Sequence, residues 1–169
     1  MISGYTLSHM LSQKVPTDYL DKALERYYEY FKVHFDSKAQ IYPSLKETLA
    51  QLRNREIDLA ILTGANRKWA EMTLSESRLS SFFSVVMTSD ELKVPKPDPG
   101  ALTTIMRKFG ADAGRTTYVG DEVKDVRTSR NAYVQAAGAF WGSWEREELR
   151  SAEPDAILNE PIELLTIAC

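Results

Sequence analysis

Short apolar segments alternate with helix-like segments along most of this chain, and this alternation constrains the fold more than any other feature. An apolar run of about four to eight residues between charged residues or glycines is typical of a strand buried on both faces. Such runs predict strands at residues 57–62, 82–87, 116–119, 134–141 and 155–158. Strands that are separated by helices form βαβ units. We therefore expect an α/β fold, a Rossmann-like doubly wound parallel sheet.

The segments around these strands have the end signals of helices. Ser44 and Glu47 have the spacing of a capping box at the start of one helix. Asp98 and Pro99 form an N-cap and first-turn pair for another helix, and Gly110 ends it. Further helices are predicted over residues 17–35 with Thr17 as N-cap, over residues 67–78, over residues 122–131, and from Ser143.

The first part of the chain differs from the rest because it carries helix signals and no strand signal. One helical face collects apolar and aromatic residues at spacings of three or four, namely Leu20, Leu24, Tyr27, Phe31 and Phe35. We therefore expect residues 1–41 to form a partial helical cap. Residues 42–169 are expected to form the α/β core.

Composition argues against several classes of function. The net charge is −3 over 169 residues, and the Lys and Arg residues are scattered, so neither nucleic-acid binding nor a basic membrane surface is indicated. No apolar run approaches the roughly 20 residues that a membrane-spanning helix needs. Cys169 is the single cysteine, which excludes a disulfide framework and a thiolate metal site. A reducing cytoplasm is the expected compartment.

Candidate functional residues lie where predicted strands end, because loops and helix N-termini converge there in sheets of this kind. Thr63 and Gly64 follow the strand at residues 57–62, and a hydroxyl with free backbone N–H groups can bind an anion. Taken alone, this segment is more often a plain helix cap. Lys96 lies between two prolines that restrict its backbone and direct its ammonium, although a solvated turn has the same pattern.

An acidic cluster follows the strand at residues 116–119. Asp121, Glu122 and Asp125 come directly after Gly120, and a helix from residue 122 would place Asp121 and Asp125 one turn apart. A hard divalent cation such as Mg²⁺ would offset the repulsion between these carboxylates. The helix dipole alone would favour Glu122, but it does not explain an aspartate at the end of a buried strand. Lys96 is a candidate partner for the second carboxylate.

The order of these features resembles the haloacid-dehalogenase-like hydrolase superfamily, and in particular its phosphoglycolate-phosphatase-like members with a helical cap. The resemblance implies that Thr63 hydrogen-bonds the transferring phosphoryl group and that Lys96 neutralises the phosphate and the nucleophile. It further implies that Asp121 binds Mg²⁺ and that Asp125 supports the lysine or the metal shell. Glu122 matches a Gly-Asp-Glu variant of the motif and is a further candidate metal ligand.

By this resemblance we expect a Mg²⁺-dependent phosphatase of a small phosphorylated metabolite, but one expected motif is missing. Relatives have a first strand that ends in Asp-x-Asp, which supplies the nucleophile and the general acid, and this sequence contains no such pair. We therefore expect an N-terminally truncated chain that is inactive in isolation. The absent strand would lie between those at residues 57–62 and 116–119, so their inner edges should need new partners and could favour homo-oligomers.

Two other interpretations of the function stay open. A non-catalytic remnant could bind phosphate or a partner protein, and a phospho-acceptor signalling domain has similar layers but places its lysine after the acidic cluster.

Relatives commonly end the helix after the acidic motif with Ala-Gly, whereas this chain has Ala132-Tyr133. A tyrosine in the left-handed conformation that suits this glycine would be strained.

Overall fold

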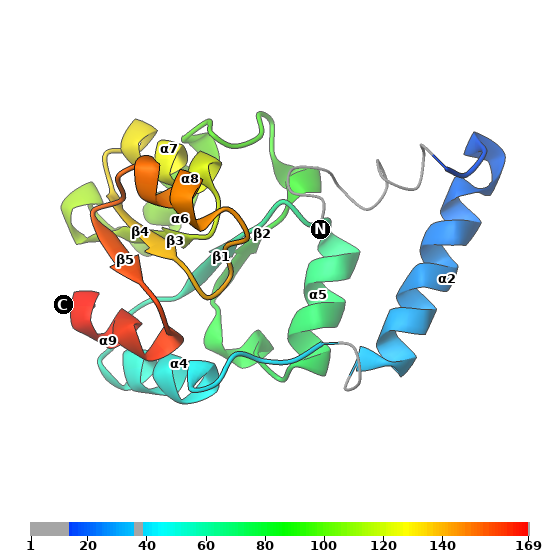
Figure 1. Cartoon of the computed structure of the whole chain (residues 1–169), viewed down its shortest axis with the longest axis horizontal. Helices are drawn as coiled ribbons and strands as arrows, with labels where there is room; N and C mark the ends of the chain where they lie inside the picture. The colour runs from blue at the N-terminus through cyan, green and yellow to red at the C-terminus, as the bar shows by residue number, and fades with distance from the viewer. Residues whose placement is uncertain (1–13, 36–38, 169) are drawn as a thin grey trace.

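A computed structural model of the chain describes residues 14–35 and 39–168, and predictions that concern residues 1–13 and 36–38 lie outside the described residues. Strands form at all five predicted places, although most are shorter than predicted (Figure 1). They are β1 (Ala60–Leu62), β2 (Val85–Met87), β3 (Thr117–Gly120), β4 (Gln135–Ala139) and β5 (Ala156–Leu158). Every strand pair is parallel, which confirms the predicted α/β class.

The helices alternate with the strands as predicted. They are α2 (Leu20–Val33), α4 (Leu45–Asn54), α5 (Arg67–Glu76), α6 (Gly100–Phe109), α7 (Val123–Asn131), α8 (Arg146–Ser151) and α9 (Leu164–Ile167). In Figure 1, α4 and α9 lie together on one side of the strands, and α7 and α8 lie on the other. Gly110 ends α6 with φ 62°, a left-handed conformation that glycine adopts without strain, as predicted.

Three predicted helix starts are wrong in detail. Ser44 precedes α4 with φ 62° and makes no side-chain cap, because its hydroxyl donates to Pro43 O instead. Thr17 lies in a short 3-10 turn after Pro16, and α2 begins only at Leu20. The last predicted helix begins at Arg146 rather than at residue 143.

The core is built by helices that pack on the strands. Leu102 and Ile105 of α6 are buried in one cluster with Leu62 of β1, and Tyr118 of β3 packs against that cluster. A second cluster joins Val126 of α7 and Leu149 of α8 to β4, through buried residues that also include Ala136 and Phe140. At about 25 cal/mol per Å² of apolar surface, these clusters are a principal source of stability.

The strands form two separate sheets rather than one continuous sheet. In the part of the chain that the structure describes, β1 is hydrogen-bonded to β2 alone, and β3–β4–β5 form the other sheet. Ala60–Leu62 pair in register with Val85–Met87, and Thr117–Gly120 pair with Gln135–Gly138. The inner strands β1 and β3 are therefore not hydrogen-bonded to each other in the described structure.

Helix α2 stands beside α5, on the side of the molecule away from β5 (Figure 1). The Trp69 ring of α5 lies 4.4 Å from the Phe31 ring and 5.9 Å from the Tyr28 ring, measured between centroids. Tyr28 is the buried tyrosine of α2, whereas Tyr27, on the predicted apolar face, is 37% exposed and its ring lies 5.5 Å from the Trp69 ring. An aromatic cluster thus joins α2 to α5, because each of these rings buries a large apolar area.

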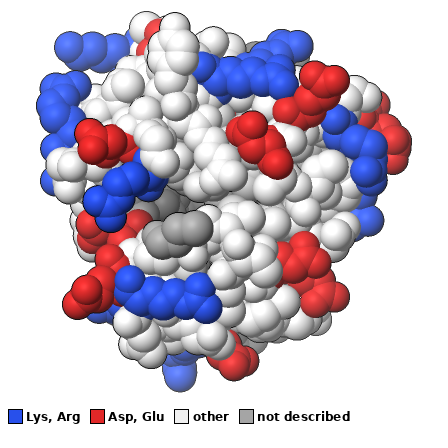
Figure 2. Space-filling model, turned by 90° about the vertical axis from the view of Figure 1, so that its left-hand side faces the viewer, with Lys and Arg blue, Asp and Glu red and all other residues white. Residues whose placement is uncertain are grey.

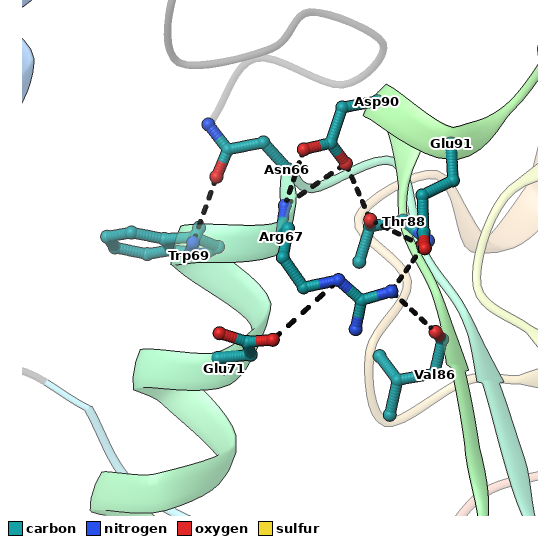
Figure 3. A network of polar contacts seen from close by, with 8 residues as sticks. All are labelled: Asn66, Arg67, Trp69, Glu71, Val86, Thr88, Asp90 and Glu91. Carbon is teal, nitrogen blue, oxygen red and sulfur yellow. Dashed lines mark hydrogen bonds and ion pairs between the residues drawn. The ribbon is translucent and has the colours of Figure 1, made fainter.

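A network of polar contacts ties the start of α5 to the end of β2 (Figure 3). The Arg67 backbone N–H donates to the Asp90 carboxylate at 3.2 Å, and its guanidinium donates to Val86 O at 2.8 Å and to Glu91. The fully buried Thr88 hydroxyl lies 2.5 Å from Asp90 Oδ1 and 2.9 Å from Glu91 Oε2. The network therefore holds the loop that leads from β1 into α5.

The outer surface carries both signs of charge. On the face of the molecule that Figure 2 shows, Lys and Arg side chains are interspersed with Asp and Glu side chains. In residues 14–35 and 39–168, no helix is both long enough and apolar enough to cross a membrane.

Replacement of the buried threonine in the polar network should change the acid stability of the protein. The Thr88 hydroxyl lowers the pKa of Asp90 below its ordinary value of 3.8, and the Thr88 backbone N–H, followed by the hydroxyl, lowers the pKa of Glu91 below 4.5. A carboxyl group whose pKa is lower in the folded state than in the unfolded state stabilises the fold at pH values above the unfolded pKa. This stabilisation is lost as the pH falls through the folded-state pKa. In Thr88→Val we expect both carboxyl pKa values to rise, as measured by NMR titration, and stability to depend less on pH below about 4.5. Unchanged carboxyl titrations in Thr88→Val would contradict this account of the network.

Tyr133 provides a second prediction, because it occupies the left-handed conformation that was expected to strain it. Its φ is 58°, and its side chain is 87% exposed, so little packing compensates. The left-handed conformation costs a residue with a Cβ about 1–2 kcal/mol, whereas glycine adopts it freely. Glycine also makes the unfolded chain more flexible, which offsets part of this gain. We therefore expect Tyr133→Gly to raise the free energy of unfolding, measured by urea denaturation, by about 0.5–1 kcal/mol. Tyr133→Ala, which keeps a Cβ, is the matched control and should give no comparable gain.

Candidate functional site

The carboxyl ends of β1 and β3 bring several of the predicted residues together. The Lys96 ammonium, on the loop after β2, lies 2.6 Å from Asp125 Oδ1 at the start of α7. Both side chains are buried, with 9% and 4% of their surfaces exposed. Because a buried charge is stable only when it is paired and hydrogen-bonded, this ion pair fixes the loop against the helix. The predicted pairing of Lys96 with the second carboxylate is thus present in the structure.

Tyr118 is a third member of this cluster that the sequence reasoning missed. Its hydroxyl lies 3.1 Å from Lys96 Nζ, 3.1 Å from Asp125 Oδ1 and 3.3 Å from Leu62 O. Burial, followed by the charge of Asp125, raises the pKa of the Tyr118 hydroxyl, which therefore stays protonated. The signal in the sequence was the tyrosine itself, since a buried tyrosine usually needs a hydrogen-bond partner.

Gly120 explains how Asp125 reaches this position. A Cβ at residue 120 would lie 2.2 Å from the Asp125 Cβ, which no side chain can tolerate. The absence of a side chain lets α7 fold back closely over the end of β3. The Asp125 carboxylate also accepts from the Glu122 backbone N–H at 3.2 Å, which completes a capping box with Glu122. The Gly-Asp-x-x-x-Asp spacing therefore places the second aspartate, Asp125, where it can pair with Lys96.

Asp121 differs from Asp125 because its carboxylate forms no ion pair with any described residue, although the charge of Lys96 acts to lower its pKa. Its residue is exposed to solvent, yet the loop after β4 approaches it, since a Cβ on Gly142 would lie 3.2 Å from the Asp121 Cβ. Desolvation raises the pKa of the Asp121 carboxyl, and the negative charges of Asp125 and Glu122 raise it further. This carboxylate would therefore gain from a bound cation.

The third predicted metal ligand, Glu122, is already engaged. Its carboxylate pairs with Lys124 and accepts from the Asp125 backbone N–H. Across the residues that the structure describes, no three carboxylate, histidine or cysteine side chains are grouped so that they could hold a metal by themselves. Mg²⁺ usually binds proteins through one or two carboxylates, together with waters and substrate phosphates. Asp121 fits this mode, with Asp125 close by.

Thr63 and Gly64 lie at the end of β1, next to the carbonyl that Tyr118 contacts. The Thr63 hydroxyl oxygen accepts from the Ala65 backbone N–H at 3.1 Å, so its own proton is left to donate. Gly64 is exposed, and a Cβ there would meet nothing within 4 Å. A phosphate oxygen could approach the hydroxyl and the backbone N–H groups of this loop.

Asn66 has a second contact that sequence reasoning missed. Its side-chain oxygen caps α5 by accepting from the Trp69 backbone N–H at 2.9 Å. Its side-chain amide donates to the Tyr28 hydroxyl on α2 at 2.8 Å. The loop that carries Thr63 is therefore linked directly to α2. The capping role could be read from the sequence, but the contact with α2 depends on how two distant segments pack.

Comparison with known proteins extends these observations. Residues 1–139 match the model of the haloacid dehalogenase-like hydrolase family. The pyrophosphatase PpaX of Oceanobacillus iheyensis is 30% identical over 154 residues, which are 91% of this chain and 72% of that protein. The phosphoglycolate phosphatase of Pectobacterium atrosepticum is 27% identical over 143 residues, which are 85% of this chain and 61% of that protein.

Solved structures show the same fold. A predicted phosphoglycolate phosphatase from Haemophilus somnus superposes with a TM-score of 0.80 at 22% identity, over 94% of this chain and 71% of that one. A hydrolase from Pseudomonas syringae superposes with a TM-score of 0.74 at 21% identity, over 96% of this chain and 76% of that one. The match to the family model covers well over half of the sequence, and it agrees with the strand-end motifs. The chain belongs to the haloacid dehalogenase-like hydrolase family.

Proposed function

We propose that this chain provides the phosphate- and Mg²⁺-binding groups of a phosphatase that acts on a small phosphorylated metabolite. The observation that carries the proposal is the buried Lys96–Asp125 pair, which lies beside the uncompensated carboxylate of Asp121. A lysine ammonium has three donors, and only two hydrogen-bond contacts of Lys96 are present in the described structure. The third donor is suited to an oxygen of the substrate phosphate.

Each residue has a proposed role at this site. Lys96 would neutralise the phosphoryl group, and Thr63 would donate its hydroxyl proton to one phosphate oxygen, with Gly64 contributing a backbone N–H. Asp121 would bind Mg²⁺, and Asp125 would hold Lys96 in place and support the metal shell. Glu122 is the weakest candidate ligand, because Lys124 already neutralises it. Bound Mg²⁺ would supply Lewis-acid polarisation of the phosphoryl group.

The similarity to relatives supports the substrate class. The relatives named above are a pyrophosphatase and a phosphoglycolate phosphatase, both of which act on small phosphorylated compounds by their names. We infer that residues 1–41 form part of a helical cap over residues 42–169, and α2 with its aromatic contact to α5 is consistent with that division. That the protein is cytoplasmic and that it forms homo-oligomers remain predictions made from the sequence.

Binding of Mg²⁺ and inorganic phosphate tests the proposed site directly. We expect Asp121→Asn to weaken Mg²⁺ binding by about tenfold or more, because the metal loses a charged ligand. Thr63→Val should weaken phosphate binding in the presence of Mg²⁺ by about tenfold, since one hydrogen bond to a charged group is lost. Titration calorimetry measures both constants. Lys96→Met is unsuitable as a first probe, because it leaves the Asp125 carboxylate buried without its partner.

Asp58→Asn is the matched control for this experiment. Asp58 is exposed and precedes β1, so it lies at the opposite end of that strand from Thr63. The change of side chain is the same as in Asp121→Asn, and both binding constants should stay at their original values. Equal Mg²⁺ affinity in the Asp121→Asn and original chains would contradict the proposed metal site.

Catalysis is a separate prediction, because the sequence contains no Asp-x-Asp pair to supply a nucleophile and a general acid. We expect the chain by itself to hydrolyse para-nitrophenyl phosphate with Mg²⁺ no faster than the buffer does. A rate above background that disappears in Asp121→Asn would contradict the predicted inactivity. Phosphate binding without turnover is also what a non-catalytic binding protein would show, so this interpretation stays the alternative.

A further inference from the structure

Tyr28 of α2 and Asn66 at the start of α5 satisfy each other's polar groups. The Asn66 side-chain amide donates to the Tyr28 hydroxyl oxygen at 2.8 Å, and this is the one hydrogen bond of that hydroxyl within the described residues. Tyr28 is only 6% exposed, so water contributes little to its solvation. Because a buried hydroxyl without a partner is costly, the pair is a specific contact rather than a chance approach of two surface side chains.

The side chain of asparagine suits this position because it meets two demands at once. The Asn66 oxygen accepts from the Trp69 backbone N–H and caps α5, while the amide nitrogen points away from Asp90 (Figure 3). Aspartate caps a helix equally well but has no donor. The hydroxyl of serine ends one bond closer to the backbone than the amide nitrogen of asparagine does. A cap with an additional donor of this reach is therefore what the contact with α2 requires.

Residues 63–66, which we call the Thr63 loop, are held on two sides. On the side of β2, Ser89 N donates to Ala65 O at 2.9 Å. On the side of α2, the described structure records one hydrogen bond, which joins Asn66 to Tyr28. Between these points, the Ala65 N–H donates to the Thr63 hydroxyl oxygen at 3.1 Å. The direction of the Thr63 hydroxyl therefore depends on contacts from both sides of the loop.

We propose that Tyr28 is a positioning residue that acts through Asn66 and holds the Thr63 loop in the conformation that directs the Thr63 hydroxyl toward a phosphate oxygen. The effect on phosphate binding rests on the proposed function. The effect on the conformation of the loop rests on the hydrogen bonds alone. Loss of the link frees the Asn66 side chain on the side of α2, so the loop keeps only its contacts with the segment after β2.

The aromatic residues of α2 allow the link to be broken without loss of packing. Tyr28→Phe removes the hydroxyl and keeps the ring, whose centroid lies 4.7 Å from the Lys68 ammonium and 5.9 Å from the Trp69 ring. Tyr27→Phe is the matched control, because the Tyr27 ring also contacts Trp69, at 5.5 Å, and no hydrogen bond of its hydroxyl occurs among the described residues. Asn66→Ser breaks the same link from the other side and keeps an oxygen that caps α5.

Titration calorimetry of the full chain with inorganic phosphate in the presence of Mg²⁺ tests the effect on binding. We expect Tyr28→Phe and Asn66→Ser each to weaken phosphate binding about fivefold, because the Thr63 hydroxyl is less often aligned. The double variant should bind as weakly as either single variant, since all three lack the same hydrogen bond. Mg²⁺ affinity should stay unchanged, because Asp121 follows β3 in the other sheet. Tyr27→Phe should bind phosphate as the original chain does.

Three results of this titration would overturn the proposal. Losses that add up in the double variant, or an equal loss in Tyr27→Phe, would mean that the variants act through general packing. An equal loss of Mg²⁺ affinity would mean the same. Unchanged phosphate affinity in Tyr28→Phe, in a protein that loses affinity in Thr63→Val, would contradict the positioning role and leave the proposed function standing.

Amide NMR spectra without phosphate or Mg²⁺ test the positioning role even if the chain binds no phosphate. In Tyr28→Phe, the Gly64 and Ala65 resonances should shift or broaden, whereas the Gly120 resonance in the other sheet should stay in place. Tyr27→Phe should leave all three in place. Unchanged Gly64 and Ala65 resonances in Tyr28→Phe would overturn the positioning role. Shifted resonances in a chain that binds no phosphate would support it and contradict the proposed function alone.

Discussion

The buried ion pair of Lys96 and Asp125 is the interaction on which the arrangement of the site depends. It joins the loop after β2 to the start of α7, and Tyr118 connects the same pair to the end of β1. Two charges that are removed from water are stable only with good geometry and further hydrogen bonds, which these contacts provide. Three segments far apart in the sequence therefore meet at one place. The pair therefore adds a polar link between the carboxyl ends of the two sheets to the apolar cluster that contains Leu62 and contacts Tyr118.

This arrangement divides the acidic cluster into residues with different tasks. Asp125 is buried, paired with Lys96 and bound to the backbone of Glu122, so its charge is balanced within the protein. Asp121 is exposed at the end of β3, and desolvation, followed by the negative charges of Asp125 and Glu122, raises its pKa, so a bound cation would stabilise its charged form. A site with one fixed positive charge and one open carboxylate is suited to a phosphate that binds together with a metal ion. That combination agrees with the phosphatases among the relatives.

The sequence predicted most of the fold because its signals are local. Apolar runs placed all five strands, and Gly110 placed a helix end, since each depends on neighbouring residues only. The capping box at Ser44 was wrong because a left-handed backbone turned its side chain away, which no local pattern shows. The contacts of Tyr118 with Lys96 and of Asn66 with Tyr28 join distant segments, so they appeared only in the folded chain.

If Lys96, Thr63 and Asp121 form one site for a phosphate and a metal ion, all three should contact ligands in the same crystal. The decisive experiment is a crystal structure of the chain grown with Mg²⁺ and vanadate, a phosphate mimic. We expect the vanadate to contact Lys96 Nζ and the Thr63 hydroxyl while Mg²⁺ binds Asp121. Vanadate bound elsewhere, with the third donor of Lys96 satisfied by the protein and no metal at Asp121, would contradict it.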